Sequence, residues 1–137
     1  MKLNDTRGFG LPEVLVAASI LTIAILTAAF SIYNLQDLGE LSKEKLTAVA
    51  DANRVLEAMR DATDTSLNNL RNTDWSAWTT TNVMNTKGPN EVQLNGETLT
   101  AVIGAGNPAQ VTLTLTWNHR QRAYQYVVVT LMTDRNG

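Results

Sequence analysis

The sequence predicts an α+β protein in which a long N-terminal helix packs on a small C-terminal antiparallel β-sheet. Three patterns predict this fold. Residues 14–33 form an uncharged apolar run, apolar residues then recur every three or four positions as far as residue 62, and alternation with period two begins beyond Pro89. A chain of 137 residues has room for one domain of this kind.

The apolar run from Val14 to Tyr33 would span about 30 Å as a helix, which is the thickness of a bilayer's hydrocarbon core. Each of its Val, Leu, Ile and Phe residues favours insertion by about 0.3–0.6 kcal/mol, and the acid Glu13 lies at the boundary, where a charge costs least. Lys2 and Arg7 precede the run, and the next basic residue is Lys43. The positive-inside rule therefore predicts a cytoplasmic N-terminus and an external C-terminal part.

Three interpretations of this segment are compatible with its composition. The first is a cleavable secretory signal cut near residues 27–29, although the run is longer than a typical signal core and has an acid at its start. The second is a permanent anchor for an unprocessed single-pass membrane protein with a small extracytoplasmic binding domain. The third is an assembly helix, which gives a role to each of Gly8, Phe9 and Glu13.

A resemblance favours the third interpretation. The segment that carries it reads Arg7-Gly8-Phe9-Gly10-Leu11-Pro12-Glu13-Val14-Leu15-Val16-Ala17. It resembles the leader junction of type IV pilins and type II secretion pseudopilins, and it is most similar to the minor pilin V-like and minor pseudopilin I-like prepilins. Pro12 departs from the family's usual Ile or Leu, but proline is tolerated in the first turn of a helix.

The resemblance implies that residues 1–8 are a leader, which prepilin peptidase removes after Gly8. It further implies that Phe9 becomes an N-methylated N-terminus and that Glu13 directs subunit assembly. Residues 9–33 would be the transmembrane and filament-core helix. Before assembly the chain would cross the inner (cytoplasmic) membrane once, with its head outside the cytoplasm, and afterwards it would lie in a pilus or pseudopilus.

The physical chemistry of Glu13 is consistent with that role. A carboxylate buried without a partner is costly, so a subunit that leaves the bilayer for a filament core needs a positive group beside it. The ammonium on Phe9 of a neighbouring subunit would supply that group and fix the axial register. The alternative is a carboxylate that merely reaches the membrane interface.

Residues 34–62 are predicted to continue the helix as an amphipathic segment. Its apolar stripe consists of Leu38, Leu41, Ala48, Ala52, Val55 and Met59, with Lys45 among them, and is widened by Leu46, Val49 and Leu56. We expect one helix from about Gly10 to Ala62. The alternative is two helices with a break near Gly39, since glycine costs about 1 kcal/mol in a helix interior.

Residues 63–137 are predicted to form a small globular β-rich head. Residues 63–88 are rich in Thr, Asn, Asp and Ser, and we expect a loop with at most one helical turn. Trp75 and Trp78 either hold this loop onto the head or face a partner.

The strands of the head are predicted from residue 91 onward. Glu91–Asn95 and Glu97–Ile103 flank Asn95-Gly96, a strong hairpin signal. Over residues 110–117 the apolar side chains alternate with threonines, which predicts a strand with one buried face. Its buried face would consist of Val111, Leu113, Leu115 and Trp117. A turn over 118–121 and a strand over 123–133 complete a three- or four-stranded antiparallel sheet.

Composition argues against several functions. The absence of cysteine excludes disulfides, thiolate metal sites and a thiol nucleophile, and 11 basic against 13 acidic residues argue against binding nucleic acid by bulk charge. His119 is expected in an exposed turn and has no second His or Cys to complete a zinc site. With Arg120 and Arg122 it forms a small basic cluster that is interpreted as a solvated hairpin tip, the alternative being contact with DNA or with the acids of a partner. Asp61 and Asp64 are expected to cap or solvate the helix end. No enzyme activity, cofactor or metal is expected.

The sequence therefore predicts a structural minor pilin or pseudopilin of a type IV pilus, a type II secretion pseudopilus or a competence filament. Its expected partners are prepilin peptidase, the membrane before assembly, and other pilin or pseudopilin subunits through the N-terminal helix. Nucleic acid is not an expected partner.

Overall fold

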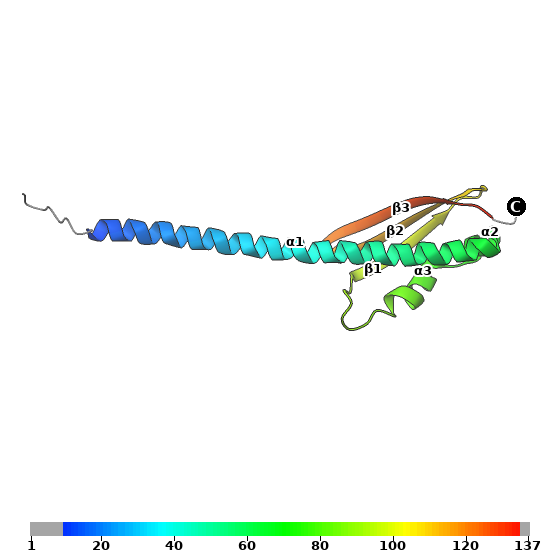
Figure 1. The fold of residues 1–137 in the computed structure, drawn as a ribbon, viewed down its shortest axis with the longest axis horizontal. Coiled ribbons are helices and arrows are strands. Elements are labelled where there is room, and N and C mark those ends of the chain that lie inside the picture. The colour runs from blue at the N-terminus through cyan, green and yellow to red at the C-terminus, as the bar shows by residue number, and fades with distance from the viewer. Residues whose placement is uncertain (1–9, 135–137) are drawn as a thin grey trace, which may run out of the picture. The chain divides into compact units, whose positions relative to one another are not determined.

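The computed structural model describes residues 10–134, in which helices precede a β-sheet (Figure 1). The chain divides into two compact units, one ending at Gly39 and the other beginning at Glu40. The elements in order are α1 (Leu11–Thr65), α2 (Leu67–Asn72), α3 (Trp75–Thr79), the π-helical turn η1 (Thr80–Met84), β1 (Asn95–Ile103), β2 (Ala109–His119) and β3 (Arg122–Met132). The expected α+β fold, with a long N-terminal helix packed on a small antiparallel sheet, is confirmed.

Helix α1 includes Gly39 without interruption and ends at Thr65, beyond the expected Ala62. The alternative of two helices with a break near Gly39 is therefore not observed. The helical penalty of one glycine, about 1 kcal/mol, is small beside the good helix formers that flank it.

Within the second unit, α1 buries one face against the sheet. Its buried residues are Ala48, Asp51, Ala52, Val55, Leu56, Met59 and Thr63. The predicted stripe is thus correct from Ala48 onward, but Leu46 is exposed, so its proposed widening at that position is wrong. Lys45 also lies outside the core, where its Nζ approaches the ring of Tyr124 at 6.0 Å from the centroid.

The three strands form an antiparallel sheet in the order β1-β2-β3. In the central strand Leu113 lies opposite Ala101 of β1 and Val128 of β3, and Leu115 lies opposite Leu99 and Tyr126. All four predicted inward residues of β2, Val111, Leu113, Leu115 and Trp117, are buried in the core. The period-two pattern therefore identified the buried face correctly, because side chains alternate across a strand.

The predicted hairpin at Asn95-Gly96 is wrong. Residues 91–94 form no strand, and Gly96, with φ +63°, lies in a register shift between Asn95 and Thr98 at the start of β1. A positive φ is as useful in a β-bulge as in a turn, so the Asn-Gly pair does not by itself distinguish them. A side chain at Gly96 would also meet Nδ2 of Asn118 at 3.0 Å.

The chain reverses direction between β2 and β3 instead. The two-residue turn consists of Arg120 and Gln121, both with positive φ (45° and 67°). This geometry matches the twist of antiparallel strands although neither residue is glycine. The predicted turn over 118–121 is in the right place, but the strands extend further into it than expected.

The segment between α1 and β1 is more helical than predicted. Ser66 accepts a hydrogen bond from the N–H of Asn68 and caps α2, while Asp74 accepts from Ser76 and Ala77 and caps α3. The polar residues that indicated a loop are therefore helix caps, a role for which Ser and Asp are equally favoured. Arg71 of α2 also donates to carbonyl oxygens of residues 104–106, which anchors the β1–β2 connection.

The two tryptophans of this segment hold it to the core. Trp75 is buried and donates Nε1–H to the carbonyl oxygen of Leu70 at 2.8 Å. Trp78 is half-buried, with its ring centroid 5.7 Å from that of Trp75. The interpretation that these residues anchor the segment is confirmed for Trp75.

Candidate functional site

The first turn of α1 contains the acid that the sequence singled out. Glu13 accepts a hydrogen bond through Oε2 from the backbone N–H of Gly10 at 2.8 Å. Gly10 in turn accepts from the N–H groups of Glu13 and Val14, so it occupies the N-cap position. This is the acidic half of a capping box, and the carboxylate also lies where the helix dipole favours a negative charge.

The apolar run that follows is exposed along its length. Its large aliphatic and aromatic side chains, from Val14 to Tyr33, are between 56% and 67% exposed. By length and composition α1 is able to cross a membrane, and none of its most apolar 18-residue window is buried. So large an apolar surface requires either lipid or other helices to cover it.

The serine and threonine hydroxyl groups in this run are satisfied within the helix. Ser19, Thr22, Thr27 and Ser31 each donate to the carbonyl oxygen four residues earlier, at 2.8–3.0 Å. In an apolar medium every polar group needs such a partner, since water is absent. Within residues 10–33, the charged side chain of the helix is that of Glu13, at the start of its apolar part.

The expected leader, residues 1–8, precedes the part of the chain that the structure describes. Gly8 and Phe9 lie outside the described residues. Glu13 is the sequence-predicted site residue that the structure describes, and it lies exposed at the helix start.

The head contains a buried polar cluster that the sequence did not reveal. Glu44 of α1 accepts a hydrogen bond from Trp117 Nε1 at 3.1 Å, and its other oxygen lies 2.9 Å from Nδ1 of His119. The ring of Tyr124 stacks on Trp117 and meets the edge of His119. One carboxylate on α1 thus binds two ring nitrogens on β2.

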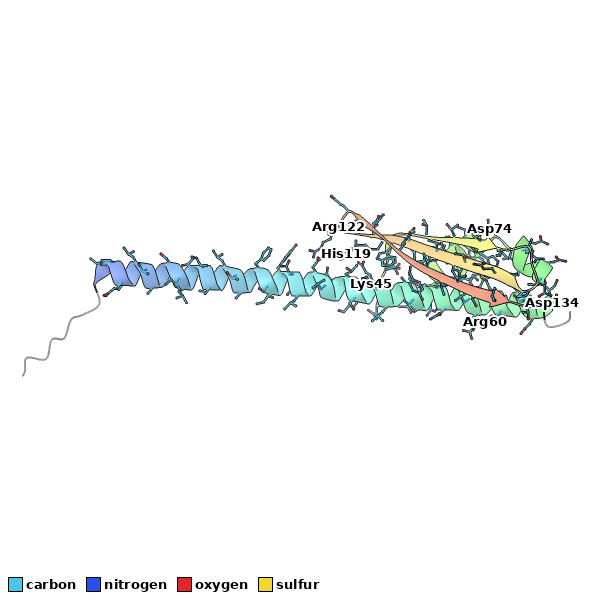
Figure 2. All side chains as sticks on the ribbon, turned by 90° about the horizontal axis from the view of Figure 1, so that it is seen from above. Lys45, Arg60, Asp74, His119, Arg122 and Asp134 are labelled. Atoms are coloured by element: carbon cyan, nitrogen blue, oxygen red, sulfur yellow. The ribbon has the colours of Figure 1, made fainter. Side chains whose placement is uncertain are left out.

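His119 was expected in an exposed turn, and that expectation is wrong. The residue is 7% exposed, because β2 continues through it and the turn that follows is only two residues long. Arg120 lies 3.4 Å from Glu40, and Figure 2 shows Arg122 at the tip of the β2–β3 hairpin while His119 lies closer to α1. The predicted cluster of three basic residues is therefore divided between the core and the surface.

A second buried cluster joins three elements. Nζ of Lys87 donates to Oε2 of Glu97 at 2.6 Å and lies 2.7 Å from Oδ2 of Asp51. Burial raises the pKa of Glu97 in spite of the neighbouring lysine. Burial alone would lower the pKa of Lys87, but the two carboxylates raise it above its usual value.

The two acids that were predicted near the end of α1 lie on the surface of the head. Asp61 and Asp64 are both exposed in the last turns of the helix, and the cap of the following helix is Ser66. No sequence signal pointed to the Glu44 or Lys87 clusters, because their members are far apart along the chain.

Comparison with protein-family models, curated proteins and solved structures found no match to this chain.

Proposed function

We propose that this chain is the precursor of a structural minor pilin or pseudopilin. Prepilin peptidase removes residues 1–8 after Gly8, Phe9 is N-methylated, and the subunit leaves the inner membrane to join a filament through the helix of residues 9–33. The observation that carries the proposal is a single acid, Glu13, in the first turn of an exposed apolar helix.

The state of Glu13 in the isolated chain supports an assembly role. A hydrogen bond from the backbone N–H of Gly10 orients the carboxylate. Moving such a charge among packed apolar helices costs several kcal/mol unless an opposite charge accompanies it. A free N-terminal ammonium on Phe9 of an adjacent subunit is the group that processing would create, and the capping geometry keeps the acid at the same end of the helix.

The exposed apolar run supports both the membrane stage and the filament stage of this proposal. Its hydroxyl groups already bond to the helix backbone, so the surface that it offers to lipid or to other helices is apolar. Lipid covers that surface before assembly, and helices of other subunits cover it afterwards. A type IV pilus, a type II secretion pseudopilus and a competence filament would each cover this surface with the helices of other subunits.

The experiment that tests the proposal is intact-mass measurement and N-terminal sequencing of the protein from native membranes, with and without an active prepilin peptidase. We expect loss of residues 1–8 and gain of one methyl group when the peptidase is active. Gly8→Leu should accumulate as full-length precursor. Gly10→Ala is the matched control and should be processed normally, because its added methyl group meets ordinary contacts at 3.5 Å or more.

Other N-termini would contradict the proposal. An intact N-terminus in cells with active peptidase would indicate an unprocessed single-pass membrane protein with a small extracytoplasmic binding domain. A start near Phe30 would indicate a secreted domain released from a cleaved signal. Normal processing of Gly8→Leu would also exclude cleavage at the proposed junction.

A further inference from the structure

The cluster of Lys87, Asp51 and Glu97 joins an amine to two acids inside the head. Asp51 lies on α1, Glu97 lies on β1, and Lys87 lies in the segment that leads from η1 to β1. Their side chains are 3%, 6% and 2% exposed, respectively. Groups this deeply buried are held in place by the surrounding core.

The contacts within the cluster are close but incomplete. Lys87 donates a hydrogen bond to Glu97 at 2.6 Å, and its Nζ forms an ion pair with Oδ2 of Asp51 at 2.7 Å. Among the described residues, Oδ2 of Asp51 and Oε1 of Glu97 accept no hydrogen bond. Two carboxylates that share one ammonium leave an unbalanced negative charge in the core, which is costly.

We propose that Lys87 and Asp51 condense to form an intramolecular amide bond, with Glu97 transferring the protons. The amine already lies against the carboxyl group, and a buried pair held in contact reacts as if its partner were at very high concentration. The product replaces an ammonium and a carboxylate with one neutral amide. Condensation is unfavourable for these ions in water, but burial destabilises the charged reactants and so favours the neutral product.

The step balances with the groups present. Glu97 takes a proton from the Lys87 ammonium along their 2.6 Å hydrogen bond, and the neutral amine then attacks Cγ of Asp51 to form the new C–N bond. One carboxyl C–O bond of Asp51 breaks. The departing oxygen leaves as water with two of the three protons that began on Nζ, one of them delivered by Glu97, which returns to its starting state.

Two features of the site suit this chemistry. A raised pKa makes Glu97 a better proton acceptor than an exposed carboxylate. A hollow of about 170 Å³ beside Asp51 and Lys87, bordered by Thr47, Arg54 and Glu91, gives the released water a route out of the core. The finished bond would tie α1 covalently to the segment that leads into the sheet, which would resist pulling the head apart.

Peptide mapping of the full-length or processed protein tests the proposal directly. Trypsin acting on the unlinked chain releases Asp51 in peptide 46–54 and Lys87 at the end of peptide 72–87. An amide on Nζ prevents cleavage after Lys87, so peptide 72–120 should be recovered joined to peptide 46–54. The branched product should weigh one water molecule less than the sum of its two parts, and fragmentation should locate the bond.

Variants separate the roles of the three side chains. Lys87→Arg keeps the positive charge but offers no amine that forms this bond, and should yield only linear peptides. Glu97→Gln should lose most of the branched product. Lys45→Arg, which alters a lysine outside the cluster, should leave the branched product at its wild-type level.

The wild-type map decides the proposal even if a variant fails to fold. Recovery of 46–54 and 72–87 as separate linear peptides from mature wild-type protein would overturn it and leave an ordinary buried ion cluster. A branched product at wild-type level in Glu97→Gln would overturn the role of Glu97. None of these readouts depends on whether the chain is processed or assembled.

Discussion

At the scale of single residues, four carboxylates of this protein have two kinds of surroundings. Glu13 lies exposed at the start of an apolar helix, whereas Glu44, Asp51 and Glu97 lie in the head beside specific nitrogen donors. A buried carboxylate needs such donors because desolvation penalises its charge. By the same reasoning, Glu13 needs a positive partner only when other helices surround it.

Replacing Glu13 tests this reasoning. Glu13→Val removes both the charge and the cap, whereas Glu13→Gln keeps an oxygen that can accept from Gly10 and removes only the charge. Both variants should be cleaved and methylated, and both should enter filaments at least about tenfold less than wild type, since tenfold corresponds to about 1.4 kcal/mol. Subunit content of purified filaments measures this. Wild-type incorporation of Glu13→Gln would show that capping, and not ion pairing, is the requirement.

Glu97 predicts how the stability of the head depends on pH. Its pKa in the folded chain is raised above the reference value of 4.5, so the folded state holds the proton more tightly than the unfolded state. This contribution to stability is therefore present at low pH and lost as pH rises from about 4.5 through the raised folded pKa. An amide between Lys87 and Asp51 would remove a cation that lowers this pKa together with an anion that raises it, and burial, the largest cause of the raised pKa, would remain.

Denaturant unfolding between pH 4.5 and 8, followed by tryptophan fluorescence in detergent, measures that dependence. Glu97→Gln lacks the titrating group and should show a smaller fall in stability over the same range. An equal fall in both proteins would assign the pH dependence to other groups.

At the scale of elements, core residues were predicted most accurately from the sequence where one face of an element is buried and the other is solvated. The alternation in β2 and the apolar stripe of α1 from Ala48 onward both identified core residues correctly. Prediction failed where one residue type serves two structures. Ser66 and Asp74 cap helices in a segment expected to be a loop, and Gly96 forms a bulge where a turn was expected.

The link between α1 and β2 through Glu44 predicts a measurable contribution to stability. Glu44→Ala leaves Trp117 Nε1 and His119 Nδ1 without their carboxylate acceptor. We expect it to lower the free energy of unfolding by about 1–3 kcal/mol, the cost of leaving the buried Trp117 Nε1–H donor unsatisfied. Glu57→Ala, at an exposed position of the same helix, should change stability by less than about 0.5 kcal/mol. Equal effects of the two substitutions would contradict a specific role for Glu44.

At the scale of the whole molecule, the chain consists of an apolar helical unit and a unit with its own core. The first has no core of its own among the described residues, and its large apolar side chains are exposed. The second buries the inner face of its sheet under α1. These opposite solvent requirements are met together when the first unit is in a membrane or a helix bundle and the second is in water.

The absence of cysteine from the sequence allows a direct test of membrane orientation. A cysteine introduced at Asp61, which is exposed on the head, should react from outside the cytoplasm with a maleimide that does not cross membranes. Asn4→Cys, in cells without active prepilin peptidase, should react only after the membrane is permeabilised. The reverse labelling pattern would contradict the orientation inferred from Lys2 and Arg7.

Features that arise from neighbours along the chain could be predicted from the order of residues: the apolar helix with Glu13 at its start, the amphipathic continuation and the buried face of β2. These features depend on local periodicity, which the order of residues records directly. The burial of His119 against Glu44, 75 positions away, and the position of Lys87 between Asp51 and Glu97 became known from the folded chain. Such contacts depend on how α1 and the sheet pack, and no local pattern of charges specifies which distant side chains that packing brings together.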